Sequence, residues 1–131
     1  MKLILEKEEA LTIIHSALCN GGLSELSATG VQLAISGNTY PDARAQLLEK
    51  DPSVKLCCED VWTQILRSGK ALEFYDHEGE EEISFTLDKA IEELSKEEAL
   101  DVVNTYKEEQ DDAYTGFELL QLCLYGEVIF G

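Results

Sequence analysis

The sequence predicts a single α+β domain over residues 1–131, in which a small antiparallel sheet is packed by about five helices. The length suits one domain, because a chain of this size buries roughly two thirds of its unfolded surface. A hydrophobic content of 44% indicates a folded core despite a net charge of −17. Helical and strand-like periods alternate along the chain, and the clearest strand signal is a central hairpin of residues 71–76 and 81–87.

The first third of the chain predicts a helix and a strand. Apolar side chains recur at helical spacing over residues 6–20, glutamates occupy the first turn, and Gly21-Gly22 marks the end. Residues 30–36 alternate between apolar and polar side chains, which predicts a half-buried strand. The short run Leu3–Leu5 fits either a strand or the lead-in to the helix. The apolar stripe of the helix comprises Ala10, Ile14, Ala17 and Leu18.

The middle third predicts two helices and the hairpin. Pro41 suits the first position of a helix that continues to residue 50. Asp51-Pro52 ends this helix, and a second helix follows over residues 58–68. Apolar side chains alternate along both arms of the hairpin, and the connecting residues 77–80 contain the glycine that a tight turn favours.

The last third predicts three helices and an edge strand. An apolar stripe marks a helix over residues 87–94, and Ser95 begins a capping-box pattern that opens the next one. Residues 112–125 are apolar nearly all round, which predicts the central helix of the core. Gly126 ends it, and residues 127–130 are expected to add the edge strand. The expected core comprises Ile14, Leu18, Val61, Trp62, Ile65, Phe74, Phe85, Leu94, Val103, Phe117, Leu120 and Leu124.

Charge is distributed very unevenly along the chain. Residues 1–70 contain 7 Lys/Arg and 9 Asp/Glu, whereas residues 71–131 contain 3 Lys/Arg and 18 Asp/Glu, so their net charges are −2 and −15. Such a field repels nucleic acid and anionic membranes and attracts basic surfaces, so we expect a basic protein partner and no direct nucleic-acid binding. No segment approaches the ~20 apolar residues of a membrane span, and no signal-peptide core is present, which predicts a cytoplasmic protein.

Nine acidic residues lie between Glu92 and Asp112. If this stretch were one helix, it would be about 30 Å long with an acid every ~3.5 Å, close to the ~3.4 Å phosphate spacing of a DNA strand. One hypothesis is therefore a DNA mimic that inhibits a basic DNA-binding protein. The alternative is that these acids form the solvated faces of ordinary surface helices. The candidate partner-binding residues are Glu92, Glu93, Glu97, Asp101, Glu108, Glu109 and Asp112.

The four cysteines form no recognisable framework. Cys57 and Cys58 are adjacent, no C-x-x-C pair occurs and nothing indicates secretion, so we expect reduced thiols buried in the core, including those of Cys19 and Cys123. Zinc binding would require Cys57 and Cys58 to meet a distant histidine, and the usual ligand spacing is missing. We therefore expect no metal and no cofactor.

No catalytic motif stands out. His15 and Cys19 share a helix face, but a nucleophilic pair also needs an oxyanion donor and a pocket, so a histidine at a packing boundary is the simpler interpretation. The acids of residues 76–82 do not match a calcium loop, because the glycine and the last acid are misplaced, which favours a solvated hairpin tip. The sequence thus predicts a non-catalytic protein, and a small enzyme with an unrecognised carboxylate-based or Cys/His-based site is the alternative.

Three segments, Ala17–Gly22, Glu59–Leu66 and Leu124–Gly131, resemble a group of uncharacterised small acidic proteins of gut bacteria and their phages or mobile elements. The shared residues are those of packing and turns, so the resemblance implies no site residue. It implies an accessory protein of a phage or mobile element, and many such proteins act by binding a host protein. Together with the charge, this predicts an acidic protein-binding module with an accessory or regulatory role, of open oligomeric state.

Overall fold

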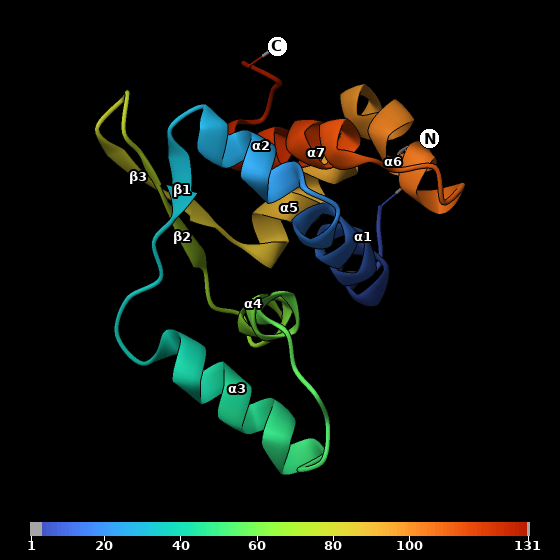
Figure 1. Cartoon of the computed structure of the whole chain (residues 1–131). Coiled ribbons are helices and arrows are strands. Elements are labelled where there is room, and N and C mark those ends of the chain that lie inside the picture. Colours follow the sequence, from blue (N-terminus) through green and yellow to red (C-terminus); the bar gives the residue numbers. More distant parts are fainter. Residues whose placement is uncertain (1–3, 131) are drawn as a thin grey trace.

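The computed structural model describes residues 4–130 and confirms the α+β class (Figure 1). Within these residues, seven α-helices and a 3₁₀ helix accompany one three-stranded antiparallel sheet. None of the described helices is both long and apolar enough to cross a membrane. The elements are α1 (Lys7–Cys19), α2 (Gly22–Ala28), β1 (Val31–Leu33), α3 (Thr39–Lys50), α4 (Cys58–Arg67), β2 (Leu72–Asp76), β3 (Glu81–Phe85), α5 (Leu87–Leu94), η1 (Glu97–Ala99), α6 (Leu100–Lys107) and α7 (Ala113–Tyr125).

The sheet contains the predicted hairpin, and β2 is its central strand. Leu72 lies opposite Phe85 and Phe74 lies opposite Ile83, while β1 pairs with the other edge of β2. These four side chains share one face of the sheet, because side chains two residues apart in a strand point the same way. Phe74 and Phe85 are completely buried, with ring centroids 6.1 Å apart. This apolar face forms one wall of the core.

The hairpin turn is organised by Asp76. The carboxylate of Asp76 accepts hydrogen bonds from the backbone NH groups of Glu78 (3.0 Å) and Gly79 (3.1 Å). Glu80, and not Gly79, has the left-handed backbone conformation in this turn (φ 51°). Gly79 instead leaves room for the Asp76 carboxylate, because a Cβ atom at Gly79 would lie 3.1 Å from an Asp76 oxygen. Residues 77–82 are exposed, as expected of a hairpin tip.

α7 is the central helix of the core, as its sequence pattern predicts. It packs against α1, α2, α5, α6 and β3, and eight of its thirteen residues are buried, so solvent reaches only a small part of it (Figure 1). Its first turn is capped by the Asp112 carboxylate, which accepts a hydrogen bond from the Thr115 NH (2.9 Å). Gly126 ends the helix in the left-handed conformation (φ 77°).

α3 packs against α4 at one end of the molecule, shown at the bottom of Figure 1. α4 packs against α1 and β2 on one side and against α3 on the other, so Thr63 and Gln64 are buried along with its apolar stripe. α3 is solvated on most of its surface, and Ala43 is its buried residue. The loop that joins the two helices borders the groove described below.

The predicted core is confirmed for every residue except Trp62. Trp62 is half-buried and packs against the edge of the core. Its size is the physical reason, because an indole is rarely enclosed completely near the surface of a small domain.

The sequence pattern does not predict α2. Gly21-Gly22 ends α1 as expected, but Gly21 adopts a left-handed conformation (φ 98°) and a new helix starts at the next residue. The strand predicted for residues 30–36 is shorter than expected, because β1 covers only Val31–Leu33.

The capping box predicted at Ser95 is wrong. Ser95 is the C-terminal cap of α5, and its hydroxyl oxygen accepts a hydrogen bond from the backbone NH of Leu5 (3.1 Å). The chain then passes through Lys96 into η1, without a side-chain cap. Leu5 therefore belongs to the lead-in to α1 and not to a strand, whereas Leu3 lies outside the described residues.

The edge strand predicted for residues 127–130 is also wrong. Gln121, fully buried in α7, holds this segment instead. The Gln121 Oε1 atom accepts hydrogen bonds from the NH groups of Ile129 (2.9 Å) and Phe130 (2.7 Å). Its Nε2 atom donates to the Phe130 carbonyl (3.4 Å). A side-chain amide thus replaces a neighbouring strand, because it offers both an acceptor and a donor.

Gly116 allows three segments to meet at one point on α7. A Cβ atom at Gly116 would overlap the side-chain oxygen of Asn20 and lie 3.1 Å from the Ala17 carbonyl oxygen. A Cβ atom at Gly22 would lie 2.6 Å from the carbonyl carbon of Gly116. Asn20 also donates a hydrogen bond to the Tyr106 hydroxyl (3.2 Å), so the same contact links α1, α2 and α6 to α7.

We expect Gly116→Ala to lower the free energy of unfolding by about 1–3 kcal/mol, the usual cost of overpacking. Helix propensity alone predicts the opposite sign, since alanine is favoured over glycine by about 1 kcal/mol. Urea unfolding followed by circular dichroism measures the change. In an Asn20→Ala background the substitution should cost less, because one clashing group is gone. A stabilised Gly116→Ala protein would contradict the close approach.

Candidate functional site

The acidic run of the last third is divided among several short elements. α5 ends at Leu94, η1 then leads directly into α6, and a loop connects α6 to Asp112. The single helix needed for phosphate-like spacing is therefore not formed. The acidic hairpin tip of residues 77–82 lies at the opposite side of the molecule from α6 (Figure 1). The two acidic segments do not make one continuous surface.

Exposed acids occupy the outer face of η1 and α6. Helical spacing places Glu97, Asp101 and Glu108 on one side, whereas Val103 and Tyr106 on the opposite side are buried. Asp101 and Glu108 are separated by about 10.5 Å along the helix axis. We call the group of exposed acids here the α6 surface; its members are Glu97, Glu98, Asp101, Glu108 and Glu109.

Two of the predicted partner-binding residues are engaged within the fold. The Glu93 carboxylate accepts hydrogen bonds from Lys96 Nζ at 3.0 Å, and its side chain is only 12% exposed. Asp112 caps α7, and hydrogen bonds from the backbone NH and hydroxyl of Thr115 hold the pKa of the Asp112 carboxyl below its usual value. Glu92 remains exposed on α5.

All three lysines of residues 71–131 have partners inside the protein. In the described part of the chain, no acid of the α6 surface forms an ion pair. The negative charge of this surface is therefore not neutralised locally. The lysine partners are the Leu124 carbonyl for Lys89 (2.8 Å), Glu93 for Lys96 (3.0 Å) and Glu9 for Lys107 (3.8 Å).

Two large apolar side chains are exposed near these acids in the chain. Leu100 precedes Asp101 and is 44% exposed, and Tyr114 follows Asp112 closely and is 55% exposed. An exposed aromatic or aliphatic side chain among acids gives a binding surface apolar contact area in addition to charge.

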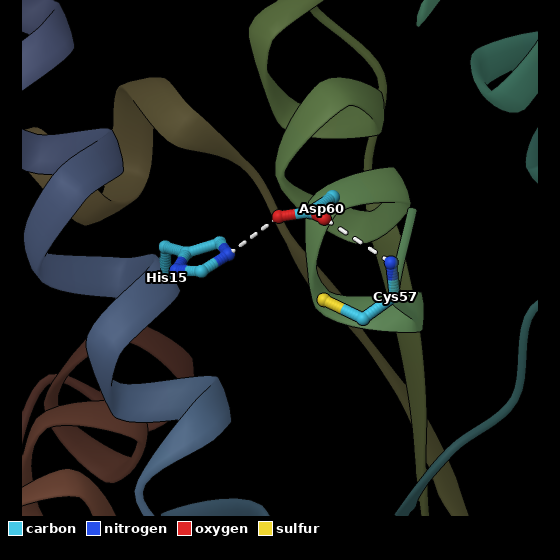
Figure 2. A group of neighbouring side chains, drawn as sticks. All are labelled: His15, Cys57 and Asp60. Carbon is cyan, nitrogen blue, oxygen red and sulfur yellow. Dashed lines mark hydrogen bonds and ion pairs between the residues drawn. The ribbon is translucent and has the colours of Figure 1, made fainter. Parts of the chain in front are cut away.

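A second group of chemically functional side chains lies where α1 faces the start of α4 (Figure 2). His15 and Asp60 are hydrogen-bonded, with 2.9 Å between His15 Nε2 and Asp60 Oδ1. The other Asp60 oxygen accepts a hydrogen bond from the NH of Cys57 (3.1 Å), the residue that precedes α4. Cys19, one turn after His15, places its sulfur 3.6 Å from His15 Nδ1 and 3.9 Å from His15 Nε2.

This group borders a groove of ≈ 400 Å³. His15, Asp60 and Arg67 contribute polar lining, and Arg67 is held by an ion pair to Glu8 (3.3 Å). The apolar lining comprises Leu11, Leu47, Val54 and Leu56.

The order Cys19, His15, Asp60 is that of a thiol–imidazole–carboxylate relay, but its geometry differs from that of a nucleophilic cysteine. The Cys19 sulfur is nearly equidistant from both imidazole nitrogens, so it is not in line with either N–H direction. Although Cys19 is exposed overall, partial burial of its thiol, helped by the negative charge of Glu59, raises the pKa of Cys19 to about 11. Because reactive cysteines have lowered pKa values, Cys19 has the character of a protonated thiol at neutral pH.

The neighbouring groups of the cluster also have shifted ionisation. Burial alone would raise the pKa of Asp60, but hydrogen bonds from the Cys57 NH and from His15 outweigh this effect and lower it. A hydrogen bond from the Asp60 backbone lowers the pKa of Cys57, but Glu59, burial and the Asp60 side chain raise it by more. The carboxylate is therefore stabilised in its charged form, and the thiol in its neutral form.

The expectation of four buried thiols is correct only for Cys123, which lies inside α7. Cys19, Cys57 and Cys58 are exposed. Cys57 and Cys58 stand at the N-terminal end of α4, before its buried stripe begins, and Cys19 is the last residue of α1. Position at helix ends, and not residue type, decides their exposure.

Neither a protein-family model nor a curated protein nor a solved structure matches this chain.

We expect Cys19 of the folded protein to react slowly with iodoacetamide near neutral pH. With a pKa of about 11 in place of 9.0, its thiolate fraction there is about 100-fold smaller than that of an ordinary thiol. The alkylation rate, followed by peptide mass spectrometry, should rise about tenfold per pH unit through the alkaline range. The urea-denatured chain is the control and should react faster at Cys19, whereas equal rates in both states would contradict the raised pKa.

Proposed function

We propose that this protein is a non-catalytic acidic module that binds a basic surface of another protein, in an accessory or regulatory role. The observation that carries the proposal is the α6 surface, whose five acids are exposed and form no ion pair among the described residues. The raised pKa of Cys19 supports the non-catalytic part of the proposal, because a nucleophilic thiol needs the opposite shift.

Charge complementarity supplies the selectivity of the proposed interaction. Residues 71–131 carry a net charge of −15, so a basic partner is attracted over a distance and a like-charged nucleic acid or membrane is repelled. This attraction is screened by salt. Leu100 and Tyr114 supply apolar contact area, which charges alone do not provide.

The partner that fits the α6 surface best is a protein segment rich in lysine or arginine. Flexible basic side chains pair with separate carboxylates and need no fixed phosphate-like spacing. The division of the acidic run among η1, α6 and a loop, and the position of the hairpin tip on the opposite side, give no such spacing. These features favour a basic protein partner over inhibition by DNA mimicry.

The proposal places the protein in the cytoplasm. Cys19, Cys57 and Cys58 are free and exposed, and exposed thiols persist in a reducing compartment, whereas an oxidising one favours disulfides. A basic partner in the same compartment, of host or phage origin, agrees with this placement.

We expect a variant with Glu97→Lys, Asp101→Lys and Glu108→Lys to bind the partner at least about tenfold more weakly at low salt, because three attractive charges become repulsive. The partner is first isolated from a lysate of the source organism at low salt and then purified. Its Kd for wild type and variant is measured by calorimetry at low and high salt, where the difference should shrink.

The matched control carries Glu25→Lys, Asp42→Lys and Glu49→Lys, three exposed acids of α2 and α3. It changes the net charge by the same amount and should retain most of the affinity. If both variants lose the same affinity, only net charge matters and the α6 surface is not the binding site. If neither variant loses affinity, the acids serve solubility and the proposal is wrong.

A further inference from the structure

We propose that His15, Cys19, Cys57 and Asp60 form a binding site for one divalent transition-metal ion, and that Zn²⁺ is the ion that fits best. His15 and Cys19 lie one turn apart on α1, whereas Cys57 and Asp60 bracket the first turn of α4. His15, Cys57 and Asp60 offer one nitrogen, one sulfur and one oxygen from two packed helices (Figure 2). Cys19, whose sulfur lies beside the His15 ring, would add a second sulfur. This site is separate from the α6 surface and does not depend on the proposed function.

The distances are close to those that a tetrahedral ion requires. Metal–ligand bonds of about 2.0–2.3 Å at tetrahedral angles separate the ligand atoms by about 3.3–3.8 Å. The ligand atoms of His15, Cys57 and Asp60 all lie within 4.8 Å of one another. The Cys19 sulfur lies 3.9 Å from the same His15 Nε2 atom that faces Asp60. The ligand atoms of His15, Cys57 and Asp60 are therefore near the spacing that an ion requires, and the Cys19 side chain must turn toward them to complete the site.

The carboxylate is already oriented for this role. One Asp60 oxygen is fixed by the NH of Cys57 (3.1 Å), which leaves the other oxygen directed at His15. Such hydrogen bonds behind a ligand hold it in place and strengthen metal binding. The two helices are fixed as well, because Ile14 of α1 and Val61 of α4 are both completely or almost completely buried in the common core.

The ligand types determine which ion is preferred. Two thiolates and an imidazole suit Zn²⁺ and its spectroscopic substitute Co²⁺, whereas Mg²⁺ and Ca²⁺ prefer oxygen ligands only. The exposed acids elsewhere on the chain offer only oxygen, so an excess of Mg²⁺ competes for them and leaves the sulfur-containing site free.

The electrostatics of the cluster also favour a cation. The carboxylates of Glu59 and Asp60 place negative charge beside the sulfur atoms of the group. A dication offsets this negative charge, and each thiol releases its proton to solvent when its sulfur binds the metal. Arg67, the cation that lines the same groove, is paired with Glu8 and donates to Gln64 (2.9 Å).

The test is a Co²⁺ titration of the tag-free, fully reduced protein in excess Mg²⁺. Wild type should bind one equivalent and show the near-ultraviolet thiolate-to-cobalt charge-transfer band with the strong visible bands of tetrahedral cobalt. Zn²⁺ should remove both. Cys57→Ser, Cys19→Ser and Asp60→Asn should each weaken Co²⁺ binding at least about tenfold. Zn²⁺ should also raise the Tm of wild type, since it binds the folded state.

The chain provides two matched controls. Cys58→Ser changes the exposed thiol next to Cys57, and His77→Ala removes the other histidine of the chain, and both should bind Co²⁺ like wild type. Circular dichroism confirms that each variant is folded. The proposal is overturned if wild type shows no charge-transfer band, if Mg²⁺ abolishes Co²⁺ binding, if Cys57→Ser retains wild-type affinity, or if Cys58→Ser loses as much as Cys57→Ser.

Discussion

Because Gly116 has no side chain, the end of α1, the start of α2 and the first half of α7 approach one another more closely than any larger residue would allow. Asn20 occupies the space beside Gly116 and reaches on to the hydroxyl of Tyr106, whose pKa is raised by burial. α6 is thereby held with Tyr106 and Val103 inward. Because Tyr106 and Val103 face inward, the acids of the α6 surface face solvent. The packing of α6 against α7 therefore determines where the unpaired negative charge lies on the surface.

The two candidate sites use negative charge in different ways. The α6 surface spreads five carboxylates over η1, α6 and the following turn, which suits a partner that contributes several separate cations. The cluster at His15 and Asp60 instead converges on one point and adds sulfur to oxygen and nitrogen, which suits a single ion. It lies in the half of the chain whose net charge is only −2, so it owes nothing to the acidic composition that dominates the sequence.

Periodicity predicted most of the fold, because long apolar stripes and the alternating hairpin have few other solutions. Periodicity failed where a residue interacts with a partner distant in sequence. The pattern predicts that Ser95 caps a helix, but its hydroxyl accepts a hydrogen bond from the NH of Leu5. The pattern also predicts a strand at residues 127–130, but Ile129 and Phe130 donate hydrogen bonds to Gln121. Only part of the cluster around His15 and Asp60 could be predicted from the sequence. The helical spacing of His15 and Cys19 could be recognised, whereas Asp60 is 45 residues from His15 and carries no local signal that the two meet.

We propose that position on the fold, and not acid content alone, makes the α6 surface the binding site. The most direct measurement is a titration of the ¹⁵N-labelled protein with a lysine-rich peptide, followed by amide chemical-shift changes. Amides of η1 and α6, including those of Asp101 and Glu108, should shift first and most. The proposal is contradicted if the hairpin tip of residues 77–82, which carries four acids, shifts as strongly at the same peptide concentration.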